Sequence, residues 1–329
     1  MSRTISLMLA LAVVPGGVLA AGSSGARQTR RTIGLVIPAP SGSPISPLVE
    51  NGARSAAAAL GDHLVVIAAS VSTIKPLIAQ HAAAIIVDNN GGDPTHEALA
   101  DALEARIPTL SYEQASPGSI WVNQSSTAQD AHALADALAA QMHGRGQYVI
   151  VPCSPAEAIV ATWLQETKAY VPKRYPGMHL AGVVYGGTGN GDAGTLVLKP
   201  VLNAHPHLRG FDFLCPGEAY TGPPQLIKDH VVGKVFSAGN GDGCPPLYSA
   251  FAWSVRRGAG EMVCAGDPTK LGYLTVWAAN YVATGHKLAP GSISVGGPVG
   301  SVQYFRQDEE LRLGQPLTIT KANVDKYAG

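Results

Sequence analysis

Short apolar runs alternate with longer segments of helical spacing along most of the chain. Runs rich in β-branched and apolar residues, typical of buried strands, occupy residues 32–38, 63–69, 82–88, 107–111, 147–152, 179–185, 210–214 and 234–237. Apolar and small residues recur at helical spacing over residues 47–60, 73–81, 95–106, 127–143, 156–170 and 271–284. This alternation predicts an α/β fold in which helices cover parallel sheets.

The alternation runs through two successive sets. A long alanine-rich helix at 127–143 separates the first group of strands from the second. Two sets of similar length predict two doubly wound, flavodoxin-like lobes. Ligands of such sheets bind beyond the carboxyl ends of the strands, so the residues that follow each strand are the candidates for a binding site.

The first residues of the chain have the pattern of a secretory signal peptide over 1–21. Arg3 carries the only charge, an apolar run spans 5–14, and small residues lead to Ala20 and Ala21. The apolar run is shorter than the roughly 20 residues needed to span a bilayer. We therefore expect cleavage after Ala20 or Ala21 and export of a soluble protein to the periplasm.

Composition and motifs narrow the function. Hydrophobic residues make up 46% of the chain and charged residues 14%, with a formal net charge of zero. A neutral chain disfavours nucleic acid as a partner, because phosphate recognition needs a surplus of Lys and Arg. The chain lacks a nucleophile elbow, a P-loop and a zinc-binding HExxH helix. We therefore expect no catalytic residues, no cofactor and no metal.

Polar side chains follow several of the predicted strands. Their positions are Asn89, Glu113, Gln114, Glu218, Tyr220 and Asn240. Each has a plainer explanation, since solvated loops, Asx-turns and helix caps use the same residue types. Polar groups at several strand ends are nevertheless the pattern expected of a sugar or polyol site.

Several segments resemble type I periplasmic sugar-binding proteins of ABC transporters, nearest to the rhamnose- and autoinducer-2-binding branch. They are residues 163–170 (WLQETKAY), 175–177 (YPG), 236–240 (FSAGN), 267–273 (DPTKLGY), 285–288 (GHKL) and 319–327 (ITKANVDKY). The resemblance covers most of the chain after Thr32. It implies two lobes that close on a ligand, which is then delivered to an inner-membrane ABC permease.

The resemblance also implies boundaries and contacts. The three crossings between lobes would fall near Tyr112–Glu113, near Gly239 and at 298–301. The N-terminal lobe would then hold 32–112 and 240–298, and the C-terminal lobe 113–239 and 299–329. Glu113 and Gln114 take the place of an acidic ligand contact, and Ser154, Glu218, Ser237 and Gly266 fall near other contacts. The expected ligand-binding set is Ser43, Asn89, Glu113, Gln114, Ser154, Glu218, Tyr220, Ser237, Asn240 and Asp267.

The chain departs from that branch at three points. Its first loop, 38–43, lacks basic and aromatic residues, the segment around Glu113 lacks a twin aspartate, and Ile159 stands where relatives have an acidic residue. These differences disfavour autoinducer-2. We expect a monomeric protein that binds a small sugar or polyol for import, the alternative being a periplasmic sensor subunit that signals to a receptor kinase.

Four cysteines permit three disulfide pairings. Cys153 and Cys215 each end a predicted strand of the second lobe, and in a flavodoxin-like order these first and third strands are neighbours. Cys244 and Cys264 both fall in the segment predicted to return to the first lobe. Pairing Cys153 with Cys215 and Cys244 with Cys264 leaves the lobes free to move, whereas free buried thiols are the alternative.

Overall fold

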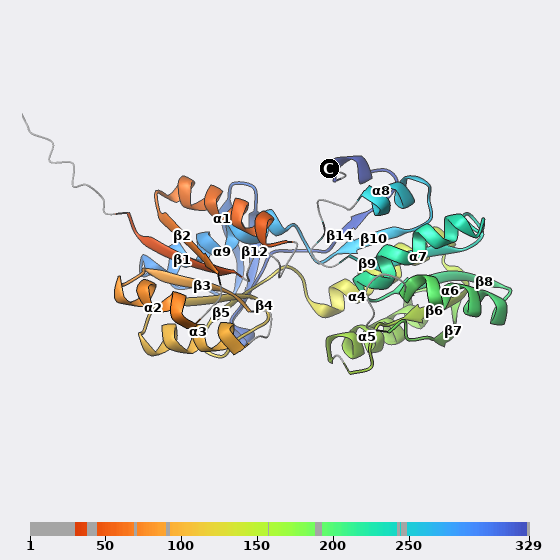
Figure 1. Cartoon of the computed structure of the whole chain (residues 1–329), viewed down its shortest axis with the longest axis horizontal. Helices are drawn as coiled ribbons and strands as arrows, with labels where there is room; N and C mark the ends of the chain where they lie inside the picture. Colours follow the sequence, from red (N-terminus) through yellow and green to blue (C-terminus); the bar gives the residue numbers. More distant parts are fainter. Residues whose placement is uncertain are drawn as a thin grey trace, which may run out of the picture. The chain divides into compact units, whose positions relative to one another are not determined.

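The computed structural model describes residues 30–37, 45–68, 71–89, 93–156, 158–187, 193–241, 244 and 249–327. They form two α/β lobes, each built on one sheet (Figure 1). The predicted signal peptide at 1–21 and the candidate ligand residue Ser43 lie outside the described residues.

The first sheet has eight strands in the order β11-β12-β13-β5-β4-β3-β1-β2. They are β1 (Thr32–Ile37), β2 (His63–Ala68), β3 (Ala84–Asn89), β4 (Thr109–Glu113), β5 (Ile120–Asn123), β11 (Gly291–Gly296), β12 (Gly300–Phe305) and β13 (Glu310–Arg312). β11 and β12 are antiparallel additions at one end of a parallel sheet. The central strand β3 is buried along its whole length, which explains its unbroken apolar run.

Helices pack on both faces of this sheet. They are α1 (Ser46–Leu60), α2 (Val71–Ala79), α3 (Asp93–Glu104) and α9 (Pro268–Ala283). Val49 of α1 and Leu274 of α9 share one core with Ile86 of β3. Leu77 of α2 and Leu99 of α3 share the core on the opposite face with Ile85. Both faces of β3 are therefore sealed from water.

The second sheet has six strands in the order β14-β10-β9-β8-β6-β7. They are β6 (Arg145–Val151), β7 (Gly177–Val183), β8 (Leu208–Phe213), β9 (Phe236–Asn240), β10 (Glu261–Cys264) and the antiparallel β14 (Leu317–Ile319). The helices of this lobe are α4 (Thr127–Met142), α5 (Ala158–Arg174), α6 (Ala193–Ala204), α7 (Pro216–Lys228) and α8 (Ser249–Arg256), with the short 3₁₀ turn η2 (Val324–Lys326). A second 3₁₀ turn, η1 (Arg306–Asp308), joins β12 to β13 in the first lobe. The order β7-β6-β8-β9-β10 is the flavodoxin-like arrangement that the sequence predicts.

The lobe boundaries differ from the prediction. The chain leaves the first sheet after β5 at Asn123, returns after β10 at Cys264, and leaves again after β13 at Arg312. The crossings predicted near Tyr112–Glu113, Gly239 and 298–301 therefore fall inside lobes. The crossings implied by the resemblance therefore lie one strand too early at β5 and β10 and two strands too early at β13. The short strands β5 and β10 lack the long apolar runs that mark the other strands.

Two of the true crossings run side by side. The Leu313 amide donates to the Asn123 carbonyl at 2.8 Å, and the Gly314 amide donates to the Gln124 carbonyl at 3.0 Å. Gly266, in the third crossing, packs against the Gln124 side chain. Gly266 was expected near the ligand, and the structure places it in this junction.

Two disulfides link strand ends of the second sheet. Cys153 pairs with Cys215 and Cys244 with Cys264, with Cα–Cα distances of 5.8 and 5.2 Å. These are the expected pairs, the first predicted from the strand order and the second from pairing within one lobe. The expected location of the second pair is wrong, however, because Cys264 ends β10 and therefore belongs to the second lobe, not the first.

Helices α1 and α9 touch backbone to backbone at two glycines. A methyl group on Gly272 would collide with the Val49 carbonyl, and one on Gly52 with the Thr269 carbonyl. Because neither carbonyl can move without separating the helices, we expect Gly272→Ala to lower the free energy of unfolding by about 1 to 3 kcal/mol in urea titrations.

A matched substitution tests this explanation. Gly217 in α7 has open space around its Cβ position. Gly217→Ala should therefore stabilise the protein by up to about 1 kcal/mol, the ordinary helix preference for alanine. Equal effects of the two substitutions would contradict a close approach at Gly272.

Candidate functional site

The carboxyl ends of β3 and β4 lie side by side in the first lobe. Asn89 and Glu113 are register partners. The Asn89 side chain is buried, and its amide donates to the carbonyls of Gln114 at 3.1 Å and Ala115 at 3.3 Å. Asn89 therefore anchors the loop after β4. Glu113 and Gln114 are exposed at this edge.

Glu113 adopts a backbone conformation that is unusual for a residue with a side chain. Its φ is +68°, in the left-handed region. Such strain persists only where the surroundings impose it, and it is found often at functional sites. Here the two hydrogen bonds from Asn89 to the following residues hold the turn in place.

A buried carboxyl that the sequence did not single out lies beside these residues. Asp88 accepts a hydrogen bond from the Tyr112 hydroxyl at 3.1 Å, and both side chains are buried. Burial raises the pKa of Asp88 to about 6, against the lowering effect of the Tyr112 hydrogen bond. Desolvation also raises the pKa of Tyr112. The sequence feature that could have identified Asp88 is its place as an aspartate near the end of the otherwise apolar strand β3.

In the second lobe, three loops at the carboxyl edge enclose Glu218. The amides of Gly186 and Gly187, which follow β7, donate to the carbonyls of Pro152 at 2.9 Å and Cys153 at 3.0 Å, which follow β6. A side chain on Gly186 would fall on the Glu218 carboxylate. Glu218 lies in the first turn of α7 and is only 1% exposed. Its surroundings therefore come from the ends of β6, β7 and β8.

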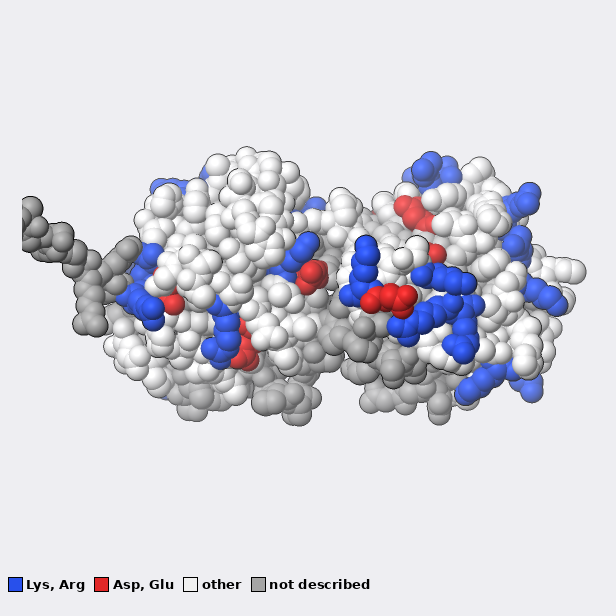
Figure 2. All heavy atoms as spheres, turned by 90° about the horizontal axis from the view of Figure 1, so that it is seen from above, with Lys and Arg blue, Asp and Glu red and all other residues white. Residues whose placement is uncertain are grey.

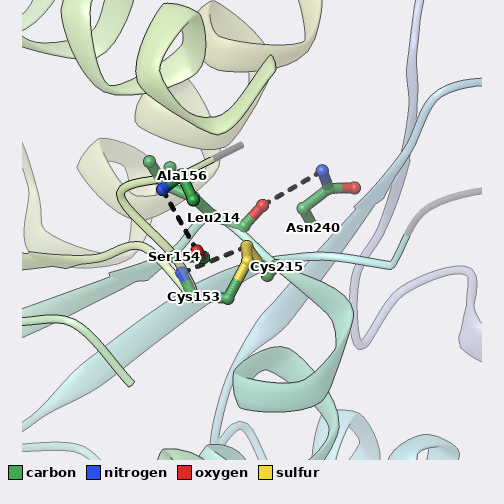
Figure 3. Close-up of a disulfide and its surroundings, with 6 residues drawn as sticks. All are labelled: Cys153, Ser154, Ala156, Leu214, Cys215 and Asn240. Atoms are coloured by element: carbon green, nitrogen blue, oxygen red, sulfur yellow. Dashed lines mark hydrogen bonds between the residues drawn. A yellow bond between two sulfur atoms is a disulfide. The ribbon is translucent and has the colours of Figure 1, made fainter. Parts of the chain in front are cut away.

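Asn240 and Ser154 lie at the same carboxyl edge of the second sheet (Figure 3). The Asn240 amide donates to the Leu214 carbonyl at 3.2 Å, which joins the ends of β9 and β8. The Ser154 hydroxyl accepts from the Ala156 amide at 3.2 Å and is largely buried. The structure thus brings Ser154, Glu218 and Asn240 to one sheet edge, as the sequence predicts for strand-end residues.

A hollow of about 220 Å³ opens beside Ser154. Its lining includes Leu164, Gln165 and Lys168 of α5, and Tyr185 after β7. Tyr185 is 46% exposed. Sequence reasoning missed these residues, although Tyr185 is the last residue of a predicted strand. An aromatic ring at that position offers an apolar face to a sugar.

Three of the predicted ligand residues have structural roles. Ser237 lies near the amino end of β9, and its buried hydroxyl donates to the Ala259 carbonyl at 2.9 Å. Asp267 caps α9, its carboxylate accepting from the Thr269 amide at 2.9 Å. Tyr220 donates to the Gly241 carbonyl at 3.3 Å and packs against Phe251. Ser237 was misplaced because β9 continues to Asn240, beyond its predicted end.

Basic side chains lie among acidic ones on the face drawn in Figure 2. Arg256 pairs with Asp325 at 2.8 Å, and the Arg257 guanidinium stacks over Trp253 at 4.2 Å from the ring centroid. Arg54 likewise pairs with Glu50 at 2.6 Å. Each of these three arginines therefore has an acidic or aromatic partner.

A profile of the periplasmic binding protein domain matches residues 33–287. A search of curated protein sequences finds no significant match. Among the described residues, no helix combines the length and apolar character needed to cross a membrane.

Solved structures share the fold at low identity. A sugar ABC transporter protein from Actinomyces odontolyticus matches with a TM-score of 0.80 and 21% identity, over 91% of this chain and 98% of that one. An ABC transporter solute-binding protein from Clostridium phytofermentas, with bound L-rhamnose, gives 0.66 and 22% over 91% and 98%. A carbohydrate transporter protein from Agrobacterium radiobacter, in complex with D-arabinose, gives 0.64 and 19% over 92% and 100%.

Proposed function

The chain belongs to the periplasmic binding protein domain family, and we propose that it reversibly binds a small sugar or polyol in the periplasm for an ABC importer. The ligand would lie between the carboxyl edges of the two sheets. The protein acts as a monomer, makes and breaks no covalent bond in its ligand, and delivers that ligand to an inner-membrane permease.

The observation that carries this proposal is the set of polar side chains at the strand ends of both lobes. Glu113 and Gln114 are exposed in the first lobe. In the second lobe, Ser154, Glu218 and Asn240 lie at the carboxyl ends of the strands. Hydrogen bonds to a carboxylate are roughly twice as strong as neutral ones, so a few such groups can hold a ligand made of hydroxyls. The sugars named for the Clostridium and Agrobacterium structures support this ligand class.

A thermal-shift screen against sugars, polyols, sugar acids and amino acids tests the ligand class. A ligand at 100 times its dissociation constant stabilises the folded protein by about 2.7 kcal/mol, which raises the melting temperature measurably. We expect a shift with a neutral sugar or polyol. Shifts with amino acids alone would overturn the proposed ligand class.

Glu113→Ala then tests the site with the sugar so identified. Loss of a hydrogen bond to a charged group costs about 1.5 to 3 kcal/mol, so calorimetry should show binding weakened by roughly 10- to 150-fold. Glu104→Ala, at the exposed end of α3, makes the same change of charge and should bind normally. Unchanged affinity in Glu113→Ala would remove Glu113 from the site.

A further inference from the structure

Three metal-ligating side chains converge at the carboxyl edge of the second sheet. The sulfurs of Cys153 and Cys215 and a carboxylate oxygen of Glu218 all lie within 4.8 Å of one another. In the structure the two sulfurs are joined in a disulfide, so neither is available as a thiolate. The same three positions acquire a different chemistry once that bond is reduced.

We propose that reduction of the Cys153–Cys215 disulfide creates a binding site for a thiophilic divalent cation such as Zn²⁺, with Glu218 as the third protein ligand. A dithiol reductant supplies two electrons and two protons, giving two cysteine thiols while the dithiol becomes a disulfide. The cation then displaces the two thiol protons and binds both thiolates. Glu218 contributes one carboxylate oxygen, and water completes a four-coordinate ion.

The positions of the three residues suit this coordination. Zn–S bonds of about 2.3 Å and Zn–O bonds of about 2.0 to 2.2 Å place tetrahedral donors roughly 3.5 to 3.8 Å apart. The Cα atoms of Cys153 and Cys215 are 5.8 Å apart, so the freed sulfurs can separate by side-chain rotation alone. Cys215 and Glu218 lie three residues apart at the start of α7, which places both at one helix end.

Backbone groups hold the Cys215 sulfur at this edge of the sheet. The Cys153 amide donates to the Cys215 sulfur at 3.2 Å, as Figure 3 shows. Cys215 is also the N-cap residue of α7. The neighbouring Glu218 carboxylate opposes two further negative charges. A divalent cation removes that repulsion, which gives the reduced trio a reason to bind one.

The second disulfide provides an internal control. Cys244 and Cys264 are both buried strand-end cysteines of the same lobe. Within the part of the chain that the structure describes, no carboxylate or histidine joins them in a comparable three-donor group. Reduction of this pair yields two thiols that have no such third ligand among the residues the structure describes.

Metal and sugar would compete for the same carboxylate. This consequence rests on the proposed function, because it takes Glu218 as a sugar contact. Binding of the metal itself does not depend on it. A metal titration without sugar therefore tests the site alone, and its failure would leave the proposed transport function untouched.

The experiment is a Zn²⁺ titration in competition with a chromophoric chelator, on protein reduced by a phosphine and on oxidised protein. We expect one Zn²⁺ per reduced chain and none per oxidised chain. Cys244→Ala/Cys264→Ala should keep the site, whereas Cys153→Ala/Cys215→Ala should lose it. Glu218→Gln, which keeps both thiols, should weaken Zn²⁺ binding by on the order of tenfold or more, the scale found when ligand shells are altered.

Three results would overturn the site. They are no binding by the reduced wild-type protein, binding retained in Cys153→Ala/Cys215→Ala, and unchanged affinity in Glu218→Gln. Circular dichroism of each reduced sample confirms that it remains folded. The comparison of Glu218→Gln with wild type holds even where the cysteine variants lose structure, because it needs no cysteine replacement.

Discussion

Asp212→Asn should stabilise the folded protein by on the order of 4 kcal/mol above neutral pH, and by progressively less as the pH falls toward 4. Asp212 lies in β8 and is fully buried, and neither of its carboxylate oxygens has a hydrogen-bond partner among the described residues. Its neighbours Phe211 and Phe213 face the core under α6 and α7. By strand alternation, Asp212 points to the opposite core, under α4 and α5.

The direction follows from the pKa of the buried carboxyl. Desolvation raises the pKa of Asp212 from 3.8 to about 7. Below about pH 4 the carboxyl is protonated in both the folded and the unfolded chain, so it does not make the free energy of unfolding depend on pH. Between these values the folded protein keeps a proton that the unfolded chain releases, so the free energy of unfolding falls as the pH rises. Above about pH 7 Asp212 is ionised in both states, and the full decrease in the free energy of unfolding is reached.

Urea titrations of the wild type and Asp212→Asn between pH 4.5 and 8.5 measure this difference. We expect the two stabilities to diverge by up to about 1.4 kcal/mol per pH unit over the range from 4 to 7. Glu104→Gln removes an exposed acid and should follow the wild type at every pH. A constant difference between Asp212→Asn and wild type would show that Asp212 does not titrate in this range.

The positions of most strands were predictable because buried parallel strands carry apolar runs, and their order followed from the flavodoxin-like fold class. The run that opens Ala84–Asn89 is an example, covered on both faces by helices. The lobe boundaries were not predictable in this way. β5 and β10 have four residues each, too few for a distinctive periodicity, and β13 pairs with β5 through contacts far apart in the sequence.

For the candidate site, the sequence predicted only which residues lie at the ends of strands. Asn89, Glu113 and Asn240 end their strands, so topology alone brings them to the sheet edges. Whether a polar side chain faces a ligand or serves the backbone depends on local geometry. Asp267 and Asn89 both resemble ligand contacts in sequence, yet one caps a helix and the other anchors a turn.

Removing either disulfide should lower the free energy of unfolding, and somewhat more for the one that closes the longer loop. Cys153 and Cys215 are separated by 62 residues, and Cys244 and Cys264 by 20. Loop-closure entropy predicts a loss of about 4 kcal/mol for Cys153→Ala/Cys215→Ala and about 3 kcal/mol for Cys244→Ala/Cys264→Ala. Urea unfolding of the oxidised proteins measures both losses.

Peptide mapping without reduction shows which cysteines are joined in the wild-type protein. It should recover Cys153 joined to Cys215 and Cys244 joined to Cys264. A peptide joining Cys153 to Cys244 or Cys264 would contradict the order β6-β8-β9-β10, because only neighbouring strand ends come within the roughly 4.4 to 6.8 Å that a disulfide spans between Cα atoms. All four cysteines lie in the second lobe. Reduction of the wild type should therefore raise hydrogen exchange at the ends of β6, β8, β9 and β10, while the first sheet, which contains none of the four cysteines, keeps its protection.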